Sequence, residues 1–148
     1  MRSVLTVIGI MLLSETMVFP ATEKIPNTQD LARMEARAAQ ASAENRLFAY
    51  AELIHISTDL VVTQMQAGDE EQASVTLECV RTYASKADVQ AAKNTRKLKN
   101  MEKLLEHSEF RLRELQMGAP LDIRPLLEKA LKQVTEVQSA LLLRIFER

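Results

Sequence analysis

Few side chains in this 148-residue sequence have the types and the spacing that chemistry requires. Glu52 and His55 stand three residues apart, so they share one face if the segment is helical. Two such Glu-x-x-His motifs, with two further glutamates, form the di-metal site of ferritin-like bundles. Here Leu104 stands three residues before His107, so the second motif is missing and we expect no di-metal centre.

A long antiparallel hairpin would separate the two histidines. In the register that such a hairpin implies, His107 faces a residue near 28, about 40 Å from His55 along the helix, so the two are not expected to share a metal. The same register brings His55 near Cys79. A Glu52/His55/Cys79 metal site or a Cys-His nucleophilic pair is therefore one interpretation. The interpretation that we favour is a partly buried histidine, a core cysteine and solvated glutamates, with no catalytic residue, metal ligand or cofactor.

Basic residues crowd the stretch 93–103, which contains one acid, Glu102. They are Lys93, Arg96, Lys97, Lys99 and Lys103. They could contact an anionic surface such as phospholipid headgroups or a wall polymer. The alternative, which we favour, is a solvated helix flank. No aromatic residue stands among these bases and the net charge is −1, so we expect no nucleic-acid binding.

Composition restricts the fold class. Aromatic residues make up 4% of the chain and glycines number 3, which argues against a β-sandwich, a barrel or a glycine-rich nucleotide loop. The single cysteine excludes an intrachain disulfide. The length suits one domain.

The N-terminal segment has the order of an export signal. A basic start is followed by the ten-residue apolar run 4–13 and then by polar residues, with a candidate cleavage point at Pro20-Ala21. We therefore expect a signal peptide over 1–21, a flexible lead over 22–27, and an exported, periplasmic protein.

Glycine and proline divide the remainder into three expected helices, at about 28–66, 69–117 and 122–146, within a single helical domain over 28–148. Asn27, Asp69 and Asp122 stand where N-caps are expected. Gly68 suits the left-handed position that ends the first helix.

The stretch 69–117 carries an unbroken alternation of four- and three-residue spacings, which predicts a straight packing seam. The seam comprises Ala73, Leu77, Val80, Ala84, Ala87, Ala91, Asn94, Leu98, Met101, Leu105, Ser108, Leu112 and Leu115. Asn94 and Ser108 are polar members of this seam, and Asn45 is a candidate partner for Asn94 across the hairpin. Buried polar residues of this kind can set helix register.

These expectations combine into an all-α fold, an elongated antiparallel three-helix bundle with a long coiled-coil-like helical hairpin. A 49-residue helix over 69–117 would be about 70 Å long. A hairpin of that length exposes apolar stripes, so we expect a homo-oligomer, with a dimer favoured.

Two resemblances accompany this interpretation. The stretch 66–73, QAGDEEQA, resembles the turn between tetratricopeptide helices, although no second copy follows at a 34-residue period. In composition and layout, most of the chain after the signal is similar to a group of exported helical bacterial proteins with no assigned activity. That resemblance implies an exported helical protein and transfers no site residue.

We therefore predict a non-enzymatic exported scaffold or adaptor that acts through protein–protein contacts. The alternative is a periplasmic chaperone-like protein that holds clients between its apolar hairpin faces. A metal-binding or enzymatic bundle comes third.

Overall fold

The computed structural model describes residues 26–147, which form helices joined by short connections. The α-helices of this range are α1 (Thr28–Gln40), α2 (Ala43–Gln66), α3 (Glu70–Lys86), α4 (Thr95–Gly118) and α5 (Arg124–Phe146). A 3-10 turn, η1 (Val89–Ala91), lies between α3 and α4. The predicted all-α class is confirmed.

The signal peptide predicted over 1–21 lies outside the described residues, as does most of the lead predicted over 22–27. Within residues 26–147, no helix combines the length and the apolar character that crossing a membrane requires.

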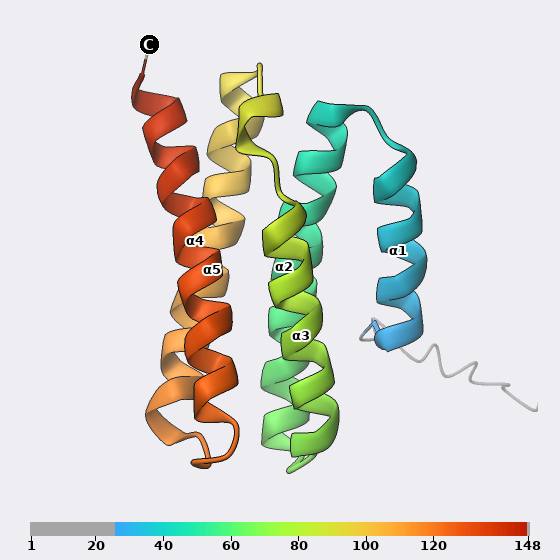
Figure 1. The fold of residues 1–148 in the computed structure, drawn as a ribbon, viewed down its shortest axis with the longest axis vertical. Helices are drawn as coiled ribbons and strands as arrows, with labels where there is room; N and C mark the ends of the chain where they lie inside the picture. Colours follow the sequence, from blue (N-terminus) through green and yellow to red (C-terminus); the bar gives the residue numbers. More distant parts are fainter. Residues whose placement is uncertain (1–25, 148) are drawn as a thin grey trace, which may run out of the picture.

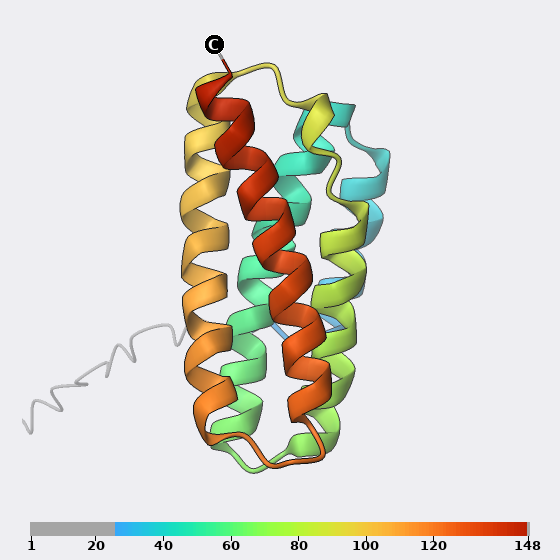
Figure 2. The ribbon, with the colours of Figure 1, turned by 60° about the vertical axis from the view of Figure 1, so that its left-hand side comes forward.

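Four helices form a bundle of two hairpins, α2–α3 and α4–α5 (Figure 1). Each helix of one hairpin packs against a helix of the other: α2 lies beside α4, and α3 lies beside α5. Figures 1 and 2 show that α2 and α4 run in the same direction, as do α3 and α5. The hairpins are therefore stacked in parallel, and α1 folds back along the outer side of α2.

The predicted three-helix bundle with a long projecting hairpin is not confirmed, because two of its three helices are each divided into two. The helix expected over 28–66 is interrupted at Ala41 and Ser42, whose ψ angles of 162° and 157° are extended. The helix expected over 69–117 is interrupted over residues 87–94. As a result α4 has 24 residues, about 36 Å, and a compact bundle replaces the 70 Å rod.

Side chains that capture backbone N–H groups explain the second interruption. The Asp88 carboxylate accepts a hydrogen bond from the Gln90 N–H at 3.1 Å. The Asn94 side chain accepts one from the Arg96 N–H at 2.9 Å and caps α4. Asp and Asn side chains offer the backbone such an alternative to a continuous helix, and the spacing of apolar residues does not reveal it.

The apolar seam is buried on both sides of this interruption. Its buried members are Ala73, Leu77, Val80 and Ala84 in α3 and Leu98, Met101, Leu105, Ser108 and Leu112 in α4. The facing side of α5 is buried as well, at Leu127, Ala130, Val134 and Leu141. The apolar stripes that were expected to be exposed on a hairpin thus cover one another in the core.

The polar residues predicted to set register are mostly at the surface. Asn45 and Asn94 are exposed, so their assignment to a buried seam is wrong. Asn45 accepts a hydrogen bond from the Lys97 ammonium at 2.9 Å. Ser108 is buried, but its hydroxyl donates to the Leu104 carbonyl of its own helix at 2.9 Å, so this bond ties no second helix to α4.

The predicted ends of the helices are confirmed in part. Asn27 caps α1 and Asp69 caps α3 through their side chains. Gly68 has φ +76°, the left-handed conformation that the turn between α2 and α3 requires. Asp122 does not cap α5, which begins after Ile123 without a side-chain cap.

We expect Asn94→Ala to lower the free energy of unfolding by about 1 kcal/mol, because the first turn of α4 loses its acceptor. Urea denaturation at pH 7 measures the change. Asn94→Leu should also lower the free energy of unfolding. The same substitution would raise it if Asn94 were in a buried seam.

The control is Asn100→Ala, at an exposed position inside the same helix. That substitution should leave stability unchanged or raise it slightly, because alanine is the better helix former. If either Asn94 variant were more stable than the parent, the assignment of Asn94 as the stabilising N-cap of α4 would be contradicted.

Candidate functional site

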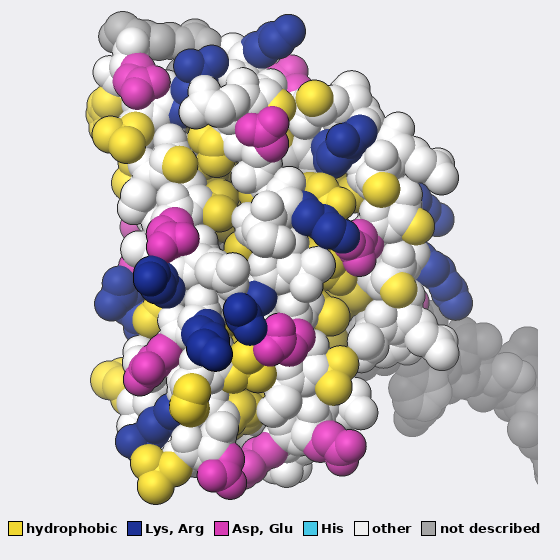
Figure 3. Space-filling model, viewed as in Figure 1, with side chains coloured by type: hydrophobic (Ala, Val, Ile, Leu, Met, Phe, Trp, Pro, Cys, Tyr) yellow, Lys and Arg dark blue, Asp and Glu magenta, His cyan; other side chains and the backbone are white. Residues whose placement is uncertain are grey.

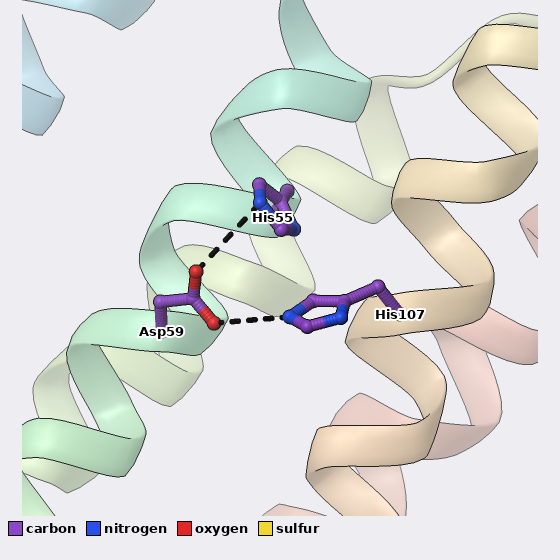
Figure 4. A group of neighbouring side chains, drawn as sticks. All are labelled: His55, Asp59 and His107. Atoms are coloured by element: carbon purple, nitrogen blue, oxygen red, sulfur yellow. Dashed lines mark ion pairs between the residues drawn. The ribbon is translucent and has the colours of Figure 1, made fainter.

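A cluster of His55, Asp59 and His107 lies where α2 and α4 run side by side (Figure 4). His55 and Asp59 stand four residues apart on α2 and therefore share one face. His107 approaches from α4, and the two imidazole ring centres are 4.9 Å apart. The Asp59 carboxylate lies between the rings, with Oδ2 3.7 Å from His55 Nε2 and Oδ1 3.5 Å from His107 Nε2.

This proximity overturns the expectation that the two histidines lie about 40 Å apart. That distance assumed one long antiparallel hairpin, in which residue 107 returns to the level of residue 28. Because the chain is interrupted over 87–94, α4 instead starts again beside the beginning of α2 and runs parallel to it. Both histidines therefore lie halfway along neighbouring helices.

Burial is the main influence on His55. It lowers the pKa of the imidazole, because the charged form loses solvation, and the nearby His107 lowers it further. The carboxylates of Asp59 and Glu52 act in the opposite direction and do not outweigh burial. At neutral pH the His55 ring is therefore mostly uncharged, and one ring nitrogen has a free lone pair.

Arg111 adds a positive charge at the edge of the cluster. Its Nε lies 3.9 Å from Asp59 Oδ1, and its Nη1 lies 3.6 Å from the Glu114 carboxylate. The guanidinium is thus shared between two acids. Asp59 Oδ1 is thus close to both Arg111 and His107, whereas Oδ2 is the oxygen close to His55.

Unpaired polar atoms gather at this place. His55 Nδ1, Asp59 Oδ1 and Arg111 Nε are all buried atoms for which the described residues supply no hydrogen-bond partner. Buried polar atoms in folded proteins are nearly always hydrogen-bonded or bound to water or an ion. Two imidazoles and a carboxylate in this arrangement can share a proton or hold a cation.

The alternative site of Glu52, His55 and Cys79 is not assembled. Cys79 lies on α3, where its thiol interacts with Tyr83 and is close to Glu35 of α1. Glu52 lines a shallow hollow between α1 and α2. Neither residue belongs to the group of potential ligands around His55 in the described chain.

An internal repeat in the sequence indicates the histidine cluster. The spacing of apolar residues over 69–117, from which the seam was predicted, does not reveal this repeat. The pattern His-x4-Leu-x3-Gln-Met-x-Ala occurs at 55–67 and again at 107–119, an offset of 52 residues. Hydrogen bonds join residues at the same offset, from Lys97 to Asn45 and from Arg81 to Gln133. Repeated helical hairpins commonly stack in parallel, so this offset would have placed the two histidines side by side.

The predicted basic residues lie around the start of α4. Lys93, Arg96, Lys99 and Lys103 are exposed, whereas Lys97 turns towards Asn45 of α2. Acids lie close by, since the Glu44 carboxylate accepts from the Asn94 N–H at 2.9 Å. Contact of these bases with an anionic surface stays a prediction.

Cys79 should react slowly. Burial raises the pKa of its thiol, so less thiolate, the reactive form, is present at pH 8. We expect Ellman's reagent to modify the native chain at least several-fold more slowly than the chain unfolded in urea. The difference should narrow as the pH rises and the native thiol also ionises. Equal rates at pH 8 would contradict this assignment and restore Cys79 as a candidate nucleophile.

Comparison with known proteins adds no relative to this description. No protein-family model, curated protein or solved structure matches the chain.

Proposed function

We propose that this protein is a non-enzymatic scaffold or adaptor that acts through protein–protein contacts, first of all with a second copy of itself. The N-terminal sequence supports export to the periplasm, although its residues lie outside the described range. The basic residues at the start of α4 are candidates for an additional, weak contact with an anionic envelope surface.

Large apolar side chains on the surface of the α4–α5 hairpin carry this proposal. Phe110 and Met117 lie seven residues apart on one face of α4, and 59% and 81% of their surfaces are exposed. Leu121, in the turn after α4, is 75% exposed. In Figure 3, apolar side chains are visible at the upper and lower ends of the α4–α5 hairpin, with charged side chains between them, and α4 itself lies mostly behind α5 in this view. Exposed apolar side chains that are neighbours on one face are typical of interaction surfaces.

A second apolar group lies at the other end of the same hairpin. Leu143 and Phe146, near the end of α5, are 64% and 78% exposed.

The hollows of the described surface, by contrast, are open and shallow. They lie beside His107, between α1 and α2, and between α3 and α5. This distribution supports association through a surface more than conversion of an enclosed substrate.

The chaperone-like alternative has less support. It required apolar hairpin faces that are free to hold a client, and those faces are buried in the bundle, for example at Val61 and Leu77. Suppression of client aggregation at stoichiometric ratios would revive this alternative.

The test is the solution mass of the full chain, measured by sedimentation equilibrium over a range of concentrations. We expect a dimer in the micromolar range and a shift to monomer in the double variant Phe110→Lys/Met117→Lys. Both side chains are exposed, so the thermal midpoint should stay within about 3 °C of the parent.

Val75→Lys is the matched control, because Val75 is an exposed apolar residue on α3, in the other hairpin. It should remain dimeric. A parent chain that is monomeric at all concentrations, or a double variant that still dimerises, would reject this self-association.

A further inference from the structure

We propose that His55, Asp59 and His107 form a binding site for one divalent transition-metal ion, with two imidazole nitrogens and one carboxylate oxygen as protein ligands. One donor atom from each residue lies within 4.8 Å of the other two. The ligands come from both hairpins, since α2 supplies two and α4 supplies one. This inference is independent of the proposed scaffold function.

The distances need only a small adjustment to fit a metal. In a tetrahedral zinc site, donors about 2.1 Å from the ion lie about 3.4 Å from one another. Asp59 Oδ2 lies 3.7 Å from His55 Nε2, and Asp59 Oδ1 lies 3.5 Å from His107 Nε2. With a single carboxylate oxygen as donor, the three donor atoms lie within 4.8 Å of one another and must approach by about 1 Å. Asp59 and His107 have side chains that are 46% and 48% exposed, so torsional changes can bring the donors together without disturbing the core.

The donor set selects the class of ion. Imidazole favours Zn²⁺, Co²⁺, Ni²⁺ and Cu²⁺, whereas Mg²⁺ and Ca²⁺ prefer a shell of oxygens. Three protein ligands leave a position for water, as in zinc sites that are open to solvent. The shallow hollow lined by Lys103, Glu106, His107 and Phe110 adjoins the cluster and gives an ion access from solvent.

Two independent features support a ligand at this place. Asp59 Oδ1 is a buried atom that accepts no hydrogen bond from the described residues, and coordination to a cation would use its lone pair instead. In addition, His55 and Asp59 stand four residues apart on one face, and a helical pair with this spacing is already oriented for chelation.

Arg111 opposes a cation but does not block it. Its guanidinium is 3.9 Å from Asp59 Oδ1 and is also paired with Glu114. It can keep the Glu114 contact while Asp59 offers Oδ1 to the metal. The charge of Arg111 should therefore weaken binding while it holds the carboxylate in place.

The experiment is a calorimetric titration of the full chain with ZnCl₂ at pH 7.5. The chain carries no affinity tag and is first freed of metal with EDTA. We expect one Zn²⁺ per chain and, at saturation, an increase of at least about 5 °C in the thermal midpoint, because the ion joins α2 to α4. Mg²⁺ at the same concentration should produce neither effect.

Three variants locate the site: His55→Gln, His107→Gln and Asp59→Asn. Each should weaken Zn²⁺ binding at least tenfold, since losing even an outer-shell partner of a metal ligand costs about 10–100-fold. Asp122→Asn, which removes an exposed carboxylate in the α4–α5 turn, is the matched control and should bind like the parent. If His55→Gln fails to fold, His107→Gln decides the result, because His107 is half exposed.

Co²⁺ provides a second measurement. Its visible absorption should report nitrogen and oxygen ligands in the parent and should be lost in the His107→Gln variant, whose folding is verified by circular dichroism. The proposal is overturned if the parent binds no Zn²⁺ saturably, or if the folded variants bind it as tightly as the parent.

Discussion

The connection between α3 and α4 is the constraint on which the remaining structure depends. Residues 87–94 end one helix and begin another at the same end of the bundle, so α4 must run parallel to α2. Val89 and Ala92 anchor the connection in the core. Glu44 of α2 accepts a hydrogen bond from the Asn94 N–H, and Arg144 of α5 donates one to the Ala92 carbonyl at 3.4 Å. Two helices, α2 and α5, are thereby tied to this one segment.

Parallel stacking of the hairpins has a chemical consequence. Helices that lie side by side in the same direction keep equivalent residues at the same level, so the repeated histidines of α2 and α4 meet. Ile54 and Leu105, on the same two helices, are fully buried, whereas Asp59 and His107 are about half exposed, so the cluster lies at the boundary between core and solvent. The same stacking places Asp59 next to Arg111, its equivalent at the 52-residue offset, so this position carries opposite charges in the two hairpins.

Partial burial at that boundary also explains why the polar atoms of the cluster lack hydrogen-bond partners. Isolated polar atoms lose hydration there, and the described residues do not fully replace it. The cost is tolerable because Asp59 and His107 stay half exposed to water. The Thr58 and Thr135 hydroxyls and the Gln64 amide oxygen have the same cost, since each is a buried atom without a hydrogen-bond partner among the described residues. Other buried polar groups are satisfied. The buried hydroxyls of Ser57 and Ser108, for example, each donate to a carbonyl of their own helix.

Periodicity and composition alone were sufficient to predict the helical class, most of the buried seam positions and the turn at Gly68, because helix periodicity and turn conformation are properties of residues near in sequence. The interruption at 87–94 was missed, since Asn94 has the spacing of a seam residue and acts as a cap. The parallel packing of α4 beside α2 was missed for the same reason. Whether His107 lies beside His55 or far from it depends on which helices pack together, and the only sequence signal for that choice is the repeat at a 52-residue offset. The burial of both hairpin faces against each other decides it, and only the tertiary structure shows the result.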